Sequence, residues 1–325
     1  MHTKQGPDPD NVDYAGYDFI WFFGVVEDRN DPAKLGRVRV RAFGWHSSEL
    51  AKVPTESLPW AQVMMPPTSA SISDIGQSPN GLVEGSWVIG FFMDGEKAQN
   101  PFVLGSVHGI PTQMFRSFQG FRDPRTEDQA IYGPYPTRIN EPDTSRLARN
   151  DANSAPEFHT ARVEGRTEDV DVAHEKTISS GSEDLNWDEP ANPWNSQYPY
   201  NHTMITESGH VKEYDDTPGN RRIHERHSAG TFYEVHDDGT LQHRIVADRY
   251  TIVANNDFVN IKGDCNLTVN GNMKVKVLGD YDLEILGNKK ETVMGTVVET
   301  FAQTQTTEAN TGVAITTPSG VINLN

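Results

Sequence analysis

Glycine recurs at every eighth position between residues 263 and 295 of this chain. Two residues before each of these glycines stands a β-branched aliphatic residue, so the unit reads V/I-x-G followed by five variable residues. Because only 27 of the 325 residues are glycine, five in one register indicate a true internal repeat. The repeat glycines are Gly263, Gly271, Gly279, Gly287 and Gly295.

Within each unit, apolar residues alternate with polar ones, which is the period of a β-strand with one buried face. The glycine that follows each strand suits a sharp bend. A strand this short cannot bury its own apolar face, so other walls must cover it. The residues predicted to form the shared core are Val253, Ile261, Leu267, Val269, Val275, Val277, Leu283, Ile285 and Val293.

The covering walls come either from the same chain, coiled as a solenoid, or from further copies of it. The calcium-binding nonapeptide signature of single-chain solenoids, G-G-x-G-x-D, is absent. A strict octad favours three chains wound into a triangular prism, in which the aliphatic residues meet on the axis and no strand edge is left open. An ordinary meander of hairpins is the alternative to both.

The region from residue 18 to residue 110 reads as a compact β domain. Turn signals such as Asn100-Pro101 separate five short candidate strands, which suits a small barrel of the OB-fold type. In the second candidate, Arg37–Phe43, alternation predicts Val38 and Val40 inward and the arginines outward. The other candidates are Ile20–Glu27, Ala61–Met65, Trp87–Met93 and Phe102–Val107.

The remaining organisation follows from composition. We predict an all-β chain: an N-terminal OB-fold barrel, an extended linker and a C-terminal intertwined triple-stranded β-helix in a homotrimer. Apolar periodicity is lost over residues 111–200 and returns in short alternating runs over 201–246. The predicted divisions are a flexible N-terminus (1–17), the OB-fold domain (18–110), the linker (111–200), a β collar (201–246) and the needle (247–325).

Charge and cysteine content exclude several classes of protein. The formal net charge of −18 argues against nucleic acid or an anionic membrane surface as an electrostatic partner. Cys265 is the only cysteine, which excludes an intrachain disulfide framework and suggests a small buried residue. The sequence shows no Sec-type signal peptide and no apolar run long enough to span a membrane, so we expect synthesis and assembly in a cytoplasm.

Motifs for catalysis or metal binding are not found. His210, His224, His227, His236 and His243 lie in the collar without ligand spacing, and Asp215 with Asp216 reads as a turn rather than an acid–base pair. No nucleophile elbow, phosphate-binding loop or His-Glu-x-x-His occurs. We therefore predict no catalytic, metal-binding or cofactor-binding residue. An axial ion in the needle stays open, because Gln303, Gln305 and Thr307 take core positions after the aliphatic register ends at Phe301.

Three segments within the predicted barrel, residues 22–47, 58–70 and 84–110, resemble the OB domain of the central spike proteins of T-even-like contractile phage baseplates. Residues 198–240 resemble the start of that family's needle, and the octads resemble its triple-stranded β-helix. The valine-glycine repeat spikes of type VI secretion share both modules.

The resemblance implies a homotrimeric structural spike in the virion tail baseplate, assembled in the host cytoplasm. Its OB domain would contact a baseplate hub protein, its C-terminal end would carry a small conical tip protein, and the needle would cross the host envelope mechanically. The best-known members insert a lysozyme domain, but residues 111–200 are too few and too polar for one, so we predict no enzymatic activity. The alternatives are a type VI secretion-like spike carrying effectors and a cell-wall hydrolase with its site in 111–200.

Overall fold

The computed structural model describes residues 19–112, 116, 118–126, 129, 140–149, 177–178, 186–190 and 193–317. The chain divides into two units, residues 1–268 and 269–325. The expected flexible N-terminus (1–17) lies outside the described residues. Within the part that is described, no helix has the length and apolar character needed to cross a membrane.

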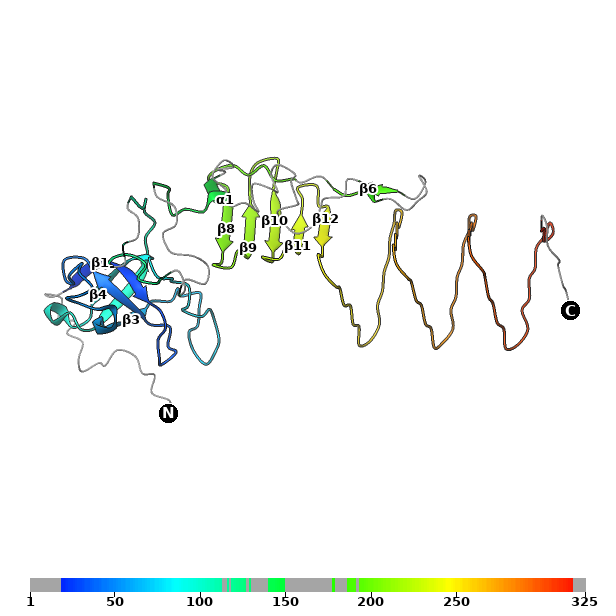
Figure 1. Cartoon of the computed structure of the whole chain (residues 1–325). Helices are drawn as coiled ribbons and strands as arrows, with labels where there is room; N and C mark the ends of the chain where they lie inside the picture. Colours follow the sequence, from blue (N-terminus) through cyan, green and yellow to red (C-terminus); the bar gives the residue numbers. More distant parts are fainter. Residues whose placement is uncertain are drawn as a thin grey trace. The chain divides into compact units, whose positions relative to one another are not determined.

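The N-terminal strands close into a barrel in the order β1-β2-β3-β5-β4 (Figure 1). All neighbours pair antiparallel except β3 and β5, which are parallel. The prediction of an all-β chain with an N-terminal OB-like barrel is confirmed, and every barrel strand lies within two residues of its predicted bounds. The strands are β1 (Ile20–Asp28), β2 (Val38–Ala42), β3 (Trp60–Val63), β4 (Trp87–Phe92) and β5 (Pro101–Ser106), with 3-10 turns at Thr55–Ser57 and Gly95–Lys97.

The barrel interior is packed with branched aliphatic and aromatic side chains. Phe22, Val26, Val40 and Val88 belong to one buried cluster. Gly90 lies opposite Phe22, and a Cβ there would stand 2.3 Å from the Phe102 carbonyl oxygen and 2.7 Å from the Phe22 ring. Glycine at this position therefore allows the barrel wall to close around the Phe22 ring.

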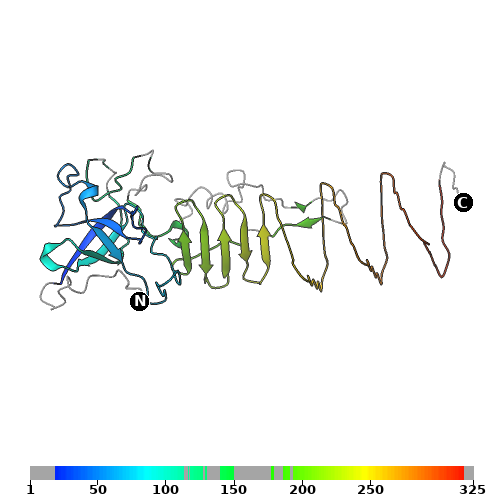
Figure 2. The same cartoon turned by 90° about the horizontal axis from the view of Figure 1, so that it is seen from below.

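The collar is a five-stranded antiparallel sheet in which each strand pairs with the next along the chain (Figure 2). Its strands are β8 (Asn201–Ile205), β9 (Val211–Asp215), β10 (Arg222–Arg226), β11 (Phe232–Val235) and β12 (Leu241–Arg244). The hairpin turns between β8 and β12 place glycine at positive φ, at Gly209, Gly219, Gly230 and Gly239.

The region predicted as linker contains a short helix and two short strands among its described residues. They are α1 (Arg146–Arg149), β6 (Thr177–Ile178) and β7 (Trp187–Asp188). β6 and β7 pair antiparallel. Asn201 of β8 donates a hydrogen bond from Nδ2 to the carbonyl oxygen of Leu147 (3.3 Å), so α1 lies against the first collar strand.

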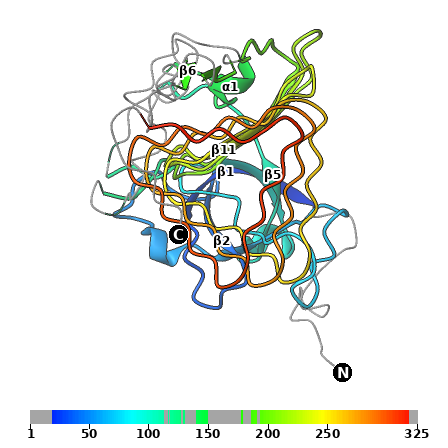
Figure 3. The same cartoon turned by 90° about the vertical axis from the view of Figure 1, so that its right-hand side faces the viewer.

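After β12 the chain is extended and bends at every eighth residue. Bends fall at 246–247, 254–255, 262–263 and so on to 310–311, and each repeat glycine is the second residue of a bend. The eight-residue spacing of the bends continues past Gly295, although the later bends contain no glycine. Within the second unit, the trace of residues 269–317 winds around one axis (Figures 1 and 3).

Candidate docking surfaces

The barrel presents a row of aromatic side chains on its outside. Phe19 directly precedes β1, and Trp21 and Phe23 belong to it. The three side chains point outward and are 62%, 56% and 40% exposed. The pairing of β1 with β4 places Phe91 opposite Trp21. Ring contacts continue the row, with centroids 5.0 Å apart between Phe19 and Phe91 and 5.3 Å apart between Phe91 and Phe102.

These side chains cover neighbouring strands β1, β4 and β5 and so form one apolar surface, which we call the aromatic face. Monomeric soluble proteins seldom leave such a contiguous patch in water, and aromatic residues are enriched where proteins associate. A signal for this face is present in the sequence, because β1 is apolar at nearly every position rather than at alternate ones, which is typical of a strand covered on both faces.

A buried ion pair supports the wall beside this face. Arg41 donates from Nε to Glu27 Oε1 (2.7 Å) and from Nη2 to Glu27 Oε2 (3.0 Å), and neither side chain is exposed to solvent. The prediction that the arginines of 37–41 point outward is therefore wrong for Arg41. Its guanidinium also binds the carbonyl oxygens of Ser47 (2.6 Å) and Val53 (2.7 Å), which satisfies it inside the protein.

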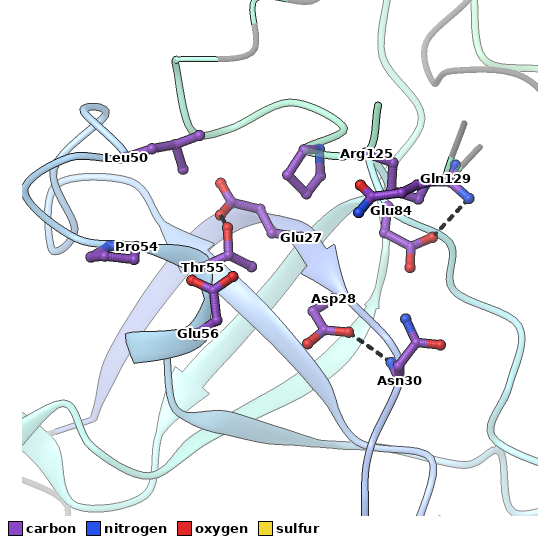
Figure 4. Close-up of a pocket in the computed structure, with 11 residues that line it drawn as sticks. Glu27, Asp28, Asn30, Leu50, Pro54, Thr55, Glu56, Glu84, Arg125 and Gln129 are labelled. Atoms are coloured by element: carbon purple, nitrogen blue, oxygen red, sulfur yellow. Dashed lines mark hydrogen bonds and ion pairs between the residues drawn. The ribbon is translucent and has the colours of Figure 1, made fainter. Parts of the chain in front are cut away.

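A polar cavity of about 450 Å³ lies beside Glu27 (Figure 4). The Glu27 carboxylate is not free to react there, because it also accepts hydrogen bonds from the Thr55 hydroxyl (2.9 Å) and the Phe121 backbone N–H (2.9 Å). Glu84, also in the lining, is paired with Arg29 (3.3 Å) and Arg125 (3.4 Å). The arrangement is that of a neutralised structural network, without a carboxylate held for acid–base work.

The collar sheet has an unusual distribution of polarity. One face buries Glu213, Arg222, His224 and Glu234, and Arg222 donates to Glu213 Oε1 (2.9 Å) and Glu234 Oε2 (3.0 Å). His224 lies against the same network, with Nδ1 2.9 Å from Glu234 Oε2. Across the described residues, no group of three or more metal-ligating side chains is found.

Residues of the predicted linker cover this charged face. Glu189 pairs with Arg244 (2.6 Å), and the Pro193 carbonyl oxygen accepts from Asn220 Nδ2 (3.0 Å). The Ser196 hydroxyl bonds to Asp215, which also accepts from the Thr217 backbone N–H, as expected of a turn residue. Glu189, Pro193 and Ser196 thus lie on the collar of their own chain, where the buried charges need partners.

The opposite collar face carries exposed apolar side chains in the single chain, beside the Lys212–Glu225 ion pair (2.6 Å). Alternation along the strands places Tyr214 on β9, Ile223 on β10 and Tyr233 on β11 on this side, and all are exposed. Register pairs Ile223 with Tyr214, so the apolar side chains lie side by side. This second surface is also a candidate for association.

The predicted needle core forms a regular stripe. Val253 and the aliphatic residues two positions before each repeat glycine, from Ile261 to Val293, are 45–52% exposed. A Cβ built on any of the five repeat glycines meets nothing within 4 Å in the single chain. Cys265, expected to be buried, is exposed in the single chain. The stripe is in place, but none of the residues that the structure describes covers it.

An OB-like barrel followed by a β collar and a long eight-residue repeat is the domain combination of baseplate spike proteins. The family profile described as the Gp5 N-terminal OB domain matches residues 44–192. The chain is 39% identical over 280 residues to Protein Gp5 of Vibrio phage KVP40, which covers 79% of this chain and 65% of that protein. It is 47% identical over 132 residues to the pre-baseplate central spike protein Gp5 of Enterobacteria phage T4, which covers 39% of this chain and 21% of that protein.

This chain is therefore related to the Gp5 central spike proteins of T-even-like phages, and the resemblance inferred from the sequence motifs is confirmed. The alignments span 65% and 21% of the two relatives, so each relative contains sequence with no counterpart here. The name of the T4 relative describes a structural component of the baseplate.

Proposed function

We propose that this protein is the central spike of a contractile phage tail baseplate, and that it pierces the host outer envelope as a rigid trimeric needle. The observation that carries the proposal is the uncovered octad stripe. Over the described residues 247–317, no backbone–backbone hydrogen bond is found, and the aliphatic stripe stays half exposed. A strand segment with free backbone groups and a free apolar side becomes stable when other copies supply both kinds of partner.

Three copies wound around one axis satisfy these needs together. The aliphatic residues would meet on the axis, and the backbone groups would pair between chains, so that no edge is left open. The exposed apolar face of the collar would join the same interface. The proposed divisions remain the barrel (18–110), the linker (111–200), the collar (201–246) and the needle (247–325).

The aromatic face of the barrel is the proposed contact with the baseplate hub protein. Its aromatic residues resemble the anchors that dominate stable interfaces. At the other end of the chain, the needle would present its last turn to a small conical tip protein. The location that follows is the tail baseplate of the virion, with assembly in the host cytoplasm.

We propose that the spike acts without enzymatic activity, its role being to resist buckling while the sheath supplies the force. The saturated Glu27 carboxylate and the paired Glu84 support this, because neither is held ready to transfer a proton. A peptidoglycan zymogram of the purified chain checks the point. Clearing of the gel would show a hydrolase and contradict this part of the proposal.

Light scattering of the purified chain tests the needle. A single species near three times 36.2 kDa is expected. The double variant Val269→Asp with Val277→Asp places charges in the stripe and should yield monomers. The matched control is Lys276→Asp, which changes charge on the opposite side of the same strand and should remain trimeric. A monomeric wild-type protein would contradict the proposal.

A further inference from the structure

Three consecutive bends of the needle, which we also call the shaft, carry large apolar side chains. We call these side chains the tips. Leu278, Leu286 and Met294 each stand directly before a repeat glycine, and they are 90%, 96% and 97% exposed. In the two preceding units the same position holds Lys262 and Asn270. The repeat therefore accepts polar residues at this position, and the three apolar tips are not required by the octad geometry.

The tips point away from the aliphatic stripe. Val277, Ile285 and Val293 directly precede the three tip residues and are 45–49% exposed. Successive side chains of an extended strand lie on opposite sides. When the stripe faces the shared axis, as the proposed function requires, the tips face outward on the assembled shaft.

The positions of the tips favour contact with lipid chains over contact with another protein. The trace of 269–317 winds around its axis, so successive bends fall at different positions around it (Figure 3). A stable protein contact needs a contiguous patch of about 800 Å² on each partner. With the tips distributed around the axis, the few Leu and Met side chains on any one side of the assembled shaft do not reach that area, whereas lipid chains conform to separate points and surround a rod.

The local charge also differs from that of the whole chain. Residues 272–297 contain four lysines (Lys274, Lys276, Lys289 and Lys290) and four carboxylates (Asp280, Asp282, Glu284 and Glu291), so their net charge is zero in a chain of −18. Lys289 pairs with Glu291 (2.8 Å), which raises the pKa of the lysine and lowers that of the glutamate. The repulsion from anionic head groups that the acidic composition implies is therefore absent at this level of the shaft. Lysine stems also lie along apolar surfaces while their ammonium groups reach water.

We propose that Leu278, Leu286 and Met294 form an apolar girdle around the shaft that contacts the acyl chains of a lipid bilayer. The inference extends the proposed function by naming what this part of the needle touches. It rests on that function in one respect, the assignment of the stripe to the shared axis.

Vesicle flotation with the full-length chain tests the girdle. The probes are vesicles of phosphatidylcholine alone and of phosphatidylcholine with phosphatidylglycerol. Wild-type protein should float with both, because the acyl chains are common to them. The triple variant Leu278→Asn, Leu286→Asn and Met294→Asn, which copies the residue already present at position 270, should reduce the bound fraction at least tenfold. Lys262→Asn, at the same place in another bend, should bind like the wild type.

Light scattering on every sample separates the two proposals. A trimer that does not float, or a triple variant that is trimeric and floats like the wild type, overturns the girdle and leaves the needle proposal intact. Flotation only with phosphatidylglycerol also overturns it, because the contact is then with head-group charge. A monomeric wild-type protein contradicts the needle itself.

Discussion

Glu27 and Arg41 form a bidentate ion pair that is entirely enclosed in the barrel wall, with N–O distances of 2.7 and 3.0 Å and no exposure of either side chain. The pair joins β1 to β2. Through the Thr55 hydroxyl and the Phe121 backbone N–H, it also ties two loops to the same carboxylate. One acidic residue thus organises segments that lie up to 94 positions apart in the sequence.

Removing the charge of Glu27 should destabilise the barrel strongly. In Glu27→Gln the Arg41 guanidinium stays buried without its counter-ion, which costs about 3–5 kcal/mol in comparable pairs. Urea unfolding followed by tryptophan fluorescence measures the loss. Glu49→Gln removes the exposed pair with Lys52 and should change stability by less than about 1 kcal/mol. Equal losses of stability in the two variants would show that the buried Glu27–Arg41 pair contributes no more than the exposed Glu49–Lys52 pair.

Gly120 should not tolerate a side chain. A Cβ there would stand 2.1 Å from Arg41 Nε and 2.3 Å from its Cδ, so Gly120→Ala forces the guanidinium away from Glu27. We expect a loss of about 2–4 kcal/mol in the free energy of barrel unfolding. Gly105→Ala, where a Cβ meets nothing within 4 Å, is the matched control and should fold normally. Similar stability of the two variants would contradict the predicted clash between a side chain at position 120 and Arg41.

Asp31 should make the barrel sensitive to acid. The Arg37 guanidinium, followed by the backbone N–H groups of Ala33 and Leu35, holds the pKa of Asp31 well below its ordinary value of 3.8. A carboxyl group with a lowered pKa in the folded state stabilises the protein above its unfolded pKa, and this contribution is lost as the pH falls through the folded pKa.

The variant Asp31→Asn isolates this contribution. At pH 7 it should lower the free energy of unfolding by about 2 kcal/mol, and the difference from the wild type should shrink as the pH falls below about 4. Urea unfolding at a series of pH values measures it, with the exposed Asp74→Asn as control. A difference that stays constant down to pH 2 would rule out the linkage.

The stability of the collar should depend on Arg222 and hardly at all on its neighbour Arg221. Arg222→Gln removes the buried guanidinium that pairs with the carboxylates of both Glu213 and Glu234, which should cost about 3–5 kcal/mol. Arg221→Gln removes only the exposed pair with Asp237 and should be nearly neutral. Thermal unfolding followed by circular dichroism compares the two. A stable Arg222→Gln variant would indicate that the two glutamates are protonated or solvated in the fold.

Much of the barrel could be predicted from the sequence because local rules agree there. Alternating runs end at turn residues such as Asn100-Pro101, and the strands appear within two residues of their predicted ends. In the collar, the sequence predicts short alternating runs over residues 201–246, and strands β8 (Asn201–Ile205) to β12 (Leu241–Arg244) lie within that range. The octad spacing also appears directly as bends. The core assignment of the octads and the domain divisions stay predictions, because they depend on copies of the chain.

Other features could not be predicted because they depend on residues far apart in the chain. Arg41 shares the alternation of Arg37 and Arg39, and nothing local shows that Glu27, Ser47 and Val53 surround its guanidinium. The aromatic face has the same origin, since it exists only where the barrel sets β1 beside β4 and β5.

By itself, the sequence determined the β character of the chain, the eight-residue period of its shaft and its relation to the central spike proteins. The first two follow from the spacing of residues along one strand, where the side-chain period of two and the need for a bend act locally. The third follows from the resemblance of whole segments, such as residues 22–47, to that family. The tertiary structure decided which charges are buried and which apolar side chains are exposed. Burial of the Glu27–Arg41 pair and exposure of the aromatic face both depend on which strands become neighbours, and that is a property of the closed barrel as a whole.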